Sequence, residues 1–290
     1  MKVKNTEEKM QKYHIHISSK HKLFDLKLKE VWNYKDLIWL FTKRSFTVTY
    51  KQTVLGPAWL FLNPLITSFI YTFVFGGIAG MDTDGIPQIL FYLSGNAMWT
   101  LFSSSLTKNA STFTSNANVF GKVYFPRLTT PISVSLASIV QFFIQFILVV
   151  LVLVFYTFTG EVTPNLLMML WVIPFTLIHL SVMGMGLGII VSSMTTKYRD
   201  LSVLVTFGVQ LLMYATPVVY PLSQLDDGIL KTVIMINPIT MPMELYRCAV
   251  LGQGTINMLY YAISLAFTVL VVVFGIMIFN KVERNFMDTV

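Results

Sequence analysis

The sequence predicts an all-α membrane protein. Of its 290 residues, 54% are hydrophobic and only 12% are charged, whereas about a quarter of a soluble domain is charged. Long apolar stretches lie between residues 56 and 280, and the loops between them alternate between rich and poor in Lys and Arg. These observations together indicate a chain that crosses a membrane several times.

Six segments are predicted to span the membrane, because a helix needs about 20 apolar residues to cross a hydrocarbon core. They are Pro57–Ala79, Ile86–Leu106, Ile132–Phe158, Leu166–Ser192, Leu201–Tyr220 and Met258–Phe279. The third segment carries no charge, whereas Ser94, Gly95 and Asn96 dilute the second. We therefore predict a six-span transmembrane domain over residues 56–280.

The basic residues predict which side each loop occupies. With six alternating spans, 19 of the 21 Lys and Arg residues fall on the side of the termini. The other side keeps only Lys231 and Arg247, together with six acidic residues. The positive-inside rule then places both termini in the cytoplasm, with residues 281–290 as a cytoplasmic tail. The net charge of +7 follows from this bias and does not indicate a nucleic-acid partner.

The N-terminal region is predicted to form two parts. Residues 1–30 are polar, lack the apolar core of a signal peptide, and are expected to be a flexible basic cytoplasmic arm. Residues 31–55 are predicted to form an amphipathic helix on the inner membrane surface, with an ordinary surface helix as the alternative. Its apolar stripe consists of Tyr34, Leu37, Ile38 and Phe41, with Trp32 and Trp39 as interfacial rings.

No metal or cofactor is expected in this chain. The single Cys248 excludes an intramolecular disulfide. We interpret His14, His16 and His21 as incidental residues of the basic arm, since no Cys or carboxylate cluster joins them. The chain has no Walker A motif, no catalytic dyad and no acidic residue in the centre of a span. Energy for uphill transport would therefore come from another polypeptide.

The cytoplasmic loop of residues 108–131 is predicted to contain a short helix with an apolar edge that points away from the membrane. Exposed apolar residues in such a loop favour a partner protein over a plain connector. The residues in question are Val119, Phe120, Tyr124 and Phe125.

Several polar or small residues lie inside the predicted spans. Ser135, Ser138, Gln141 and Gln145 share one helical stripe, which faces either protein or a wet lumen. Gly184 and Gly188 form a small-xxx-small face for close helix packing rather than a nucleotide loop. His179 is interpreted as a packed, hydrogen-bonded residue in preference to a proton relay.

Residues 221–254 are too polar to span a membrane and too apolar for a free loop. Pro221, Pro238 and Pro242 divide the region, and residues 233–236 and 241–250 are predicted to be short helices that re-enter the outer leaflet. We expect a cap over the outer mouth of a pore, with an inert connector as the alternative.

Four stretches resemble type-2 ABC exporter permeases, and more narrowly the O-antigen and polysaccharide export group (Wzm-type). They are residues 50–59 (YKQTVLGPAW) with Asn63-Pro64, residues 116–118 with 122–127 (KVYFPR), residues 216–221 (TPVVYP), and Asn237-Pro238 with Tyr246-Arg247. They occur in order on a matching six-span topology, from about residue 30 to the C-terminus.

The resemblance implies a homodimer bound to two copies of a cytoplasmic ABC ATPase, which would bind ATP and Mg. Residues 34–41 would be the interface helix. The coupling helix would dock on the ATPase through Asn116, Asn118, Val119, Phe120 and Lys122. The outer gate would include Asn237, Pro238, Glu244 and Arg247.

The implied substrate is a polyprenyl-diphosphate-linked glycan moved outward across the cytoplasmic membrane, as in lipopolysaccharide biosynthesis. Aromatic rings can stack on sugar faces; the channel candidates are Tyr71, Tyr92, Trp99, Phe102, Tyr214 and Tyr220, with interfacial anchoring or packing as the alternative. Cations for the diphosphate would be Lys43, Arg44, Lys51 and Arg127, which anionic lipid would explain equally well.

Two alternatives remain: the same architecture exporting teichoic acid, a drug or a lipid, or a membrane enzyme of glycan assembly. The enzyme would need a carboxylate or metal site at the membrane face. The acidic pairs Asp82 with Asp84 and Asp226 with Asp227 have no supporting ligands in the sequence.

Overall fold

The computed structural model describes residues 28–289 except 52, 121, 124 and 199. The described residues form helices joined by turns and loops, without a β-strand. The helices are α2 (Leu28–Asn33), α3 (Lys35–Tyr50), η2 (Gly56–Ala58), α4 (Trp59–Tyr71), η3 (Thr72–Ile78), α5 (Gln88–Ala110), α6 (Thr112–Phe120), α7 (Thr129–Phe158), α8 (Leu166–Thr195), α9 (Leu201–Tyr214), η4 (Leu222–Gln224), α10 (Ile229–Ile236), α11 (Thr240–Leu251) and α12 (Met258–Thr289). The predicted arm lies almost wholly outside the described residues.

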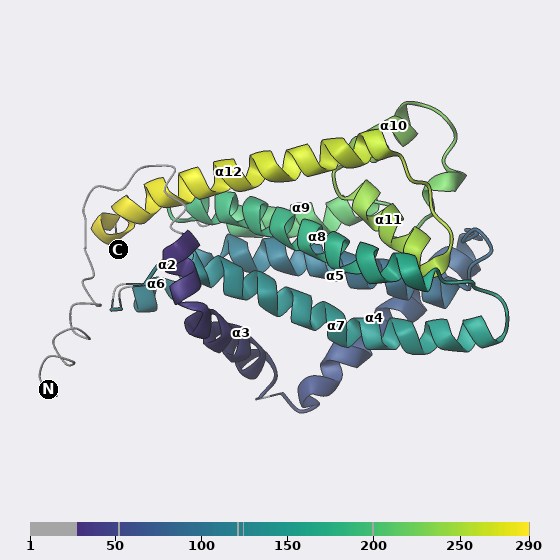
Figure 1. The fold of residues 1–290 in the computed structure, drawn as a ribbon, viewed down its shortest axis with the longest axis horizontal. Helices are drawn as coiled ribbons and strands as arrows, with labels where there is room; N and C mark the ends of the chain where they lie inside the picture. Colours follow the sequence, from purple (N-terminus) through teal and green to yellow (C-terminus); the bar gives the residue numbers. More distant parts are fainter. Residues whose placement is uncertain (1–27, 52, 121, 124, 199, 290) are drawn as a thin grey trace, which may run out of the picture.

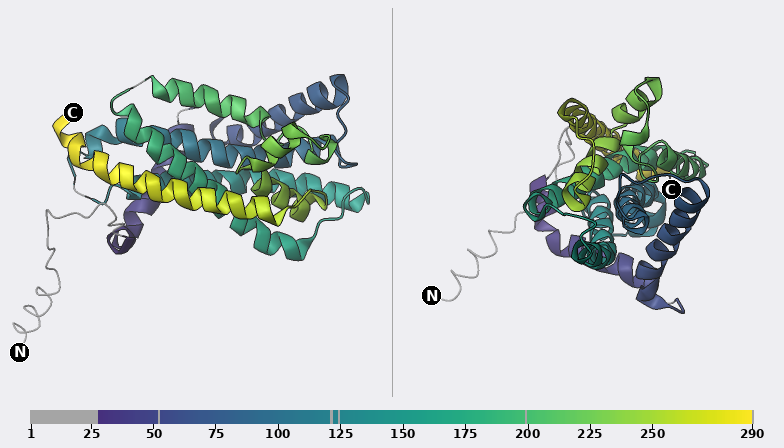
Figure 2. Two further views of the ribbon diagram at one scale, coloured as in Figure 1. Left: turned by 90° about the horizontal axis from the view of Figure 1, so that it is seen from above. Right: turned by 90° about the vertical axis from the view of Figure 1, so that its right-hand side faces the viewer.

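The long helices form an elongated bundle in which successive members run in opposite directions. Helices α5, α7, α8 and α12 lie roughly along the long axis, with α9 beside them and α4 oblique (Figures 1 and 2). One end carries α2, α6 and the C-terminus, and the other carries α10 (Figure 1). The end with α2 and α6 is called the α6 end below, and the opposite one the α10 end.

Four segments are long and apolar enough to cross a membrane: Gly56–Ile78, Thr129–Phe158, Leu166–Thr195 and Met258–Val282. Helix α9 is apolar but shorter, and α5 does not reach the same hydropathy. Helix α5 can be more polar because it packs against α4, α7, α8 and α9. A helix enclosed by protein does not need the apolar surface that lipid requires.

Close packing of α5, α8 and α12 depends on glycine, as predicted for Gly184 and Gly188. A Cβ at Gly184 would lie 2.9 Å from the carbonyl oxygen of Phe102, and one at Gly188 would lie 2.5 Å from the Cβ of Asn109. On the α12 side, a Cβ at Gly275 would lie 2.9 Å from the carbonyl oxygen of Gly186. Glycines on both faces of α8 therefore allow two neighbouring helices to approach it.

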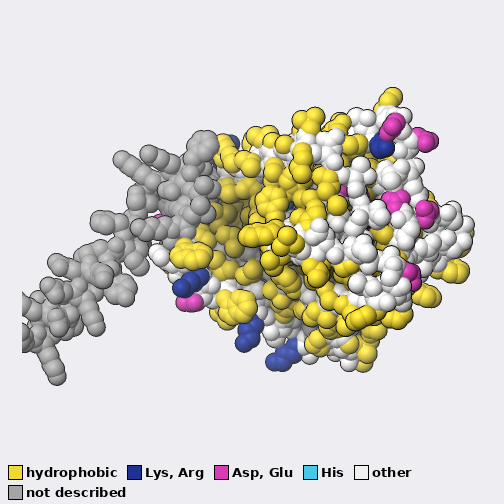
Figure 3. Space-filling model, turned by 45° about the vertical axis from the view of Figure 1, so that its right-hand side comes forward, with side chains coloured by type: hydrophobic (Ala, Val, Ile, Leu, Met, Phe, Trp, Pro, Cys, Tyr) yellow, Lys and Arg dark blue, Asp and Glu magenta, His cyan; other side chains and the backbone are white. Residues whose placement is uncertain are grey.

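Charged side chains separate between the two ends of the bundle. Most acidic side chains in this view lie at the α10 end, with a Lys or Arg side chain among them, and most Lys and Arg side chains lie near the α6 end (Figure 3). A broad hydrophobic surface lies between them in the same view. Exposed apolar residues of the long helices include Phe69 of α4, Leu151 of α7 and Leu270 of α12. This pattern matches a membrane-embedded belt between two aqueous ends.

Helices α2 and α3 differ in one respect from the sequence prediction. The stripe of Tyr34, Leu37, Ile38 and Phe41, expected to face lipid, packs against a cluster of buried residues at the α6 end. Thr42 is also buried and donates a hydrogen bond to the carbonyl oxygen of Ser133 at 3.2 Å. Helix α7 offers this stripe an apolar surface, and the position of α3 on the inner membrane surface stays a prediction. The opposite face exposes Trp32 and Trp39.

Candidate functional site

Polar side chains join α5, α7 and α8 inside the bundle. The Ser105 hydroxyl donates to the carbonyl oxygen of Ser181 at 2.8 Å, and Asn109 donates to the Ser135 hydroxyl at 3.1 Å. Ser138 and Gln145 are buried as well. Of the two readings of the α7 stripe, packing against protein therefore holds for Ser135, Ser138 and Gln145.

Gln141 is the exception in this stripe. It is half-buried, and its Oε1 accepts a hydrogen bond of 3.2 Å from the Nζ of Lys108. Lys108 belongs to α5 and is exposed. This cation was absent from the predicted entrance set, although its position two residues after a predicted span was visible in the sequence.

His179 is a packed residue, as predicted. Its side chain is 4% exposed. Its Nε2 lies 2.9 Å from the Thr268 hydroxyl, and its Nδ1 lies 3.3 Å from the Tyr261 hydroxyl. Both ring nitrogens are thus occupied by hydroxyl groups of α12, and no acidic partner is among the contacts given for the described residues.

The predicted coupling segment is helical, but its aromatic residues point inward. Phe120 and Phe125 are each only 5% exposed and belong to the cluster at the α6 end, together with Phe113 and Phe279. The expectation that Phe120 and Phe125 face a partner was therefore wrong. Helices α2, α6, α8 and α12 meet here, and the rings fill the space between them.

Other residues of the coupling segment remain accessible. Lys122 and Val123 are exposed, and Val119 is half-buried. Asn116 donates to the carbonyl oxygen of Thr112 at 2.9 Å within α6. The side chain of Asn118 lies outside the described residues. The surface available to a partner is thus the outer face of α6 together with residues 122–123.

The four predicted entrance cations divide into two kinds. Lys43, Arg44 and Lys51 are exposed near the α6 end. Arg127 is half-buried, with its guanidinium 5.5 Å from the ring centre of Phe120. A cation over an aromatic face supports the packing of Phe120, so Arg127 has a structural role in addition to its charge.

Three of the six predicted channel aromatics are core residues. Tyr92 and Phe102 have no exposed surface and Trp99 is 6% exposed, all within the main hydrophobic core. The prediction that these three residues line a channel was wrong for this chain. Helix α5 lies at the centre of the bundle, and neighbouring helices cover the three side chains. Tyr71 and Tyr220 are half-buried, whereas Tyr214 is 56% exposed. The Tyr220 hydroxyl donates to the carbonyl oxygen of Tyr214 at 3.2 Å.

The region of residues 221–254 contains two short helices close to those predicted, α10 and α11. Within α11, Arg247 and Glu244 form an ion pair of 3.0 Å whose side chains are 2% and 3% exposed. Arg247 also donates to the carbonyl oxygen of Val218 at 2.9 Å and lies 4.1 Å from the ring centre of Phe91.

Further contacts fasten the same region to its neighbours. Glu244 accepts a hydrogen bond of 2.9 Å from the backbone N–H of Thr255. Asn237 donates to the Thr216 hydroxyl at 3.0 Å, and the Pro238 carbonyl accepts from the Ser264 hydroxyl. The four predicted gate residues therefore bind α9, α11 and α12 together at the α10 end.

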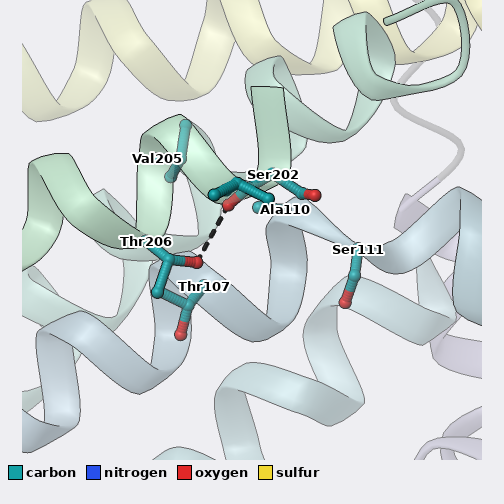
Figure 4. Close-up of a pocket in the computed structure, with 7 residues that line it drawn as sticks. Thr107, Ala110, Ser111, Ser202, Val205 and Thr206 are labelled. Atoms are coloured by element: carbon teal, nitrogen blue, oxygen red, sulfur yellow. Dashed lines mark hydrogen bonds between the residues drawn. The ribbon is translucent and has the colours of Figure 1, made fainter. Parts of the chain in front are cut away.

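A cavity of about 310 Å³ lies between α5 and α9 near the α6 end. Four hydroxyl side chains and three small apolar residues line it: Thr107, Ser111, Ser202, Thr206, Ala110, Val203 and Val205. Figure 4 shows the labelled side chains of the two helices around it, with the Thr206 hydroxyl donating to the carbonyl oxygen of Ser202 at 2.9 Å. Sequence analysis missed this site, since its residues come from separate spans.

Together, the apolar belt, the alternating helices and the polar ends define a multi-pass helical membrane protein. Residues 36–251 match the family described as ABC-2 type transporter, from the start of α3 to the end of α11. The chain belongs to this family, whose members are transport subunits rather than enzymes.

Curated relatives extend the match. The chain is 30% identical over 254 residues to an O-antigen export system permease protein RfbA of Klebsiella pneumoniae, covering 87% of this chain and 94% of the relative. It is 26% identical over 223 residues to a protein of the same name from Myxococcus xanthus, covering 76% of this chain and 82% of the relative.

Proposed function

We propose that this chain is the membrane-spanning subunit of an ATP-driven ABC transporter that exports a polyprenyl-diphosphate-linked O-antigen polysaccharide across the cytoplasmic membrane. The observation that carries the proposal is the likeness to O-antigen export permeases over 87% of the chain. Those names favour O-antigen over the teichoic acid, drug and lipid alternatives. They also leave no support for a membrane enzyme of glycan assembly.

The proposed topology has six spans with both termini in the cytoplasm. Helix α5 is 23 residues long, enough for about 35 Å at 1.5 Å per residue, and its enclosure by protein supports its assignment as a span. Helix α9 has 14 residues, and after it the chain continues through turns at residues 215–220 toward the α10 end. The basic α6 end then faces the cytoplasm, in agreement with the positive-inside rule.

The proposed complex contains two copies of this chain and two copies of a cytoplasmic ABC ATPase, which supplies ATP and Mg. The outer face of α6 with Lys122 and Val123 would contact the ATPase. Phe120 and Arg127 would hold that surface in place from behind rather than touch the partner. The exposed Lys43, Arg44 and Lys51 would attract the diphosphate of the substrate or anionic head groups.

Loss of the chain tests the function directly. In a cell that assembles an O-polysaccharide on a polyprenyl carrier, deletion of this permease should leave the lipid-linked glycan in the cytoplasmic leaflet. Binding of a glycan-specific antibody to inside-out vesicles, but not to intact spheroplasts, measures that location. Undiminished glycan on the spheroplast surface after deletion would refute the proposal.

A second measurement separates the substrate alternatives. Cells that carry this permease with its cognate ATPase, and that make either an O-polysaccharide or a teichoic acid, are compared for surface polymer. Export of the O-polysaccharide alone supports the proposed substrate. Export of teichoic acid alone would replace it.

A further inference from the structure

The accessible surface of α5 has an unusual composition for a membrane protein. From Leu90 to the end of the helix, every residue that is not buried is polar. These residues are Thr100, Ser103, Ser104, Thr107 and Lys108, and Ser111 follows directly after the helix. A helix face that borders lipid is normally apolar. The accessible face of α5 therefore borders water, a polar ligand or another protein surface rather than lipid.

Helix α9 presents a matching row of polar side chains. Ser202, Thr206, Gln210 and Tyr214 are spaced by four residues, which places them along one face of the helix. Thr206, Gln210 and Tyr214 are exposed and Ser202 is half-buried. On another side of the same helix, Leu204 is 62% and Leu211 is 54% exposed. The polar row is interrupted by Val203, which is 71% exposed, and the opposite side of the helix is apolar.

The two polar faces meet at the cavity between α5 and α9. Thr107 and Ser111 come from one helix, and Ser202 and Thr206 from the other. The helices run in opposite directions (Figure 1), so Thr100 and Ser103 extend the α5 face toward the α10 end, as Gln210 and Tyr214 extend the α9 face. We call the surface formed by these eight residues the hydroxyl groove.

The hydroxyl groups of the groove donate within their own helices. Thr107 donates to the carbonyl oxygen of Ser103 at 2.7 Å, Thr206 to that of Ser202 at 2.9 Å, and Ser111 to that of Lys108 at 3.0 Å. Each oxygen can still accept a further hydrogen bond. The groove is therefore satisfied when empty, yet it offers acceptors to any ligand rich in hydroxyl donors.

We infer that the hydroxyl groove is a hydrated contact surface for an uncharged, polyhydroxylated segment of the exported glycan, an inference that rests on the proposed function. Single acceptors on a rigid helix face bind a sugar hydroxyl weakly, and the side chains of Ala110, Val203 and Val205 suit the apolar faces of sugar rings. Neither helix contains an acidic residue. Repeated weak contacts of this kind hold a chain in the path without fixing one register.

Accessibility of introduced cysteines tests whether the groove is wet. Cys248 is the single native cysteine and is first replaced by Ala, with export checked in that background. Single cysteines are then placed at Thr107, Thr206 and Gln210, with Leu204 and Leu211 as matched controls on α9. Inside-out vesicles containing the complete transporter are treated with a charged, membrane-impermeant methanethiosulfonate. The groove positions should be labelled at least tenfold faster than the two controls; equal labelling would overturn the inference.

Export kinetics test whether the glycan touches the groove. Thr107→Val and Thr206→Val keep the side-chain shape and remove the acceptor oxygen. Each is expected to slow glycan export about fivefold, the factor for one hydrogen bond of about 1 kcal/mol. Ser138→Ala removes a buried hydroxyl outside the groove and should leave export unchanged. Normal export by both valine variants in a folded transporter would overturn the inference.

Two further outcomes would also overturn it and leave the proposed function in place. Disulfide cross-linking between two copies through Thr206→Cys, with no reagent labelling, would identify the groove as a protein contact. The labelling rate is also compared between vesicles that contain the glycan and vesicles without glycan synthesis. Labelling that is fast and equal in both would identify a water path that the glycan avoids. If the transporter exports no glycan at all, the labelling pattern still decides whether the groove is wet.

Discussion

Arg247 and Glu244 form an ion pair of 3.0 Å inside the protein, on one helix and almost without solvent contact. The guanidinium also reaches the carbonyl oxygen of Val218 and the ring of Phe91. Gly95 makes this possible, since a Cβ there would lie 2.9 Å from the Val218 oxygen and 3.1 Å from Nη2 of Arg247. A residue that weakens the second span as an apolar sequence is thus required by the structure.

Arg247→Leu is expected to destabilise the protein by about 3–5 kcal/mol, because it leaves the Glu244 carboxylate buried without its cation. Thermal unfolding of the purified protein in detergent measures the loss. Lys231→Ala is the matched control: it removes an ion pair of 2.8 Å to Asp227, whose side chain is 95% exposed. The control should unfold like the wild type, and similar losses in both variants would contradict the role given to Arg247.

Gly188→Ala should destabilise the bundle by about 1–3 kcal/mol, the usual cost of overpacking. The new methyl group would lie 2.5 Å from the Cβ of Asn109 and 2.6 Å from the carbonyl oxygen of Leu106. Gly208→Ala on α9 is the control, since a Cβ there meets nothing within 4 Å. Chemical unfolding of both variants compares them; a stable Gly188→Ala protein would show that α5 and α8 have room to separate.

Phe120→Asp should lower the stability of the permease itself, because it places a carboxylate in the aromatic cluster at the α6 end. Val123→Asp changes a side chain that is 59% exposed and should leave folding intact. If residues 122–123 contact the ATPase, Val123→Asp reduces co-purification of the ATPase at unchanged permease yield. Wild-type co-purification of that variant would remove residue 123 from the docking surface.

His179→Phe should destabilise the protein by about 1–3 kcal/mol, since the buried Tyr261 hydroxyl loses its partner and the Thr268 hydroxyl keeps only the Ser264 carbonyl oxygen. His179→Gln retains polar groups at the same site and should keep most of the stability and the export rate. Export by the Gln variant is compared with the wild type in vesicles at matched protein levels. Complete loss of export in a stably folded Gln variant would favour the proton-relay reading.

The sequence located much of the architecture. The apolar segments at Ile132–Phe158 and Leu166–Ser192 correspond to α7 and α8, because burial in lipid requires continuous apolar residues. The prolines and the mixed polarity of residues 221–254 predicted short helices, which appear as α10 and α11. The Gly184 and Gly188 pair predicted a close helix contact, because helical spacing places both on one face.

The candidate site was less predictable. Phe120, Tyr92 and Phe102 were assigned to surfaces, yet all three are buried, because a sequence does not reveal which side of a helix its neighbours cover. The hydroxyl groove was missed for a related reason: Thr107 and Thr206 are ninety-nine positions apart in the chain. In the sequence, the serine and threonine residues near these two positions only lowered the hydropathy of the predicted spans.

The sequence by itself determined that this chain is helical, that it has membrane-crossing segments, and that its basic and acidic loops lie apart, since hydropathy and charge act locally along each segment. Tertiary structure alone decided which faces are covered. It enclosed α5 and turned the α3 stripe onto protein. It also buried the Glu244–Arg247 pair of α11 inside the bundle and brought the hydroxyl groups of α5 and α9 together. These outcomes depend on contacts between distant segments, and no local pattern encodes them.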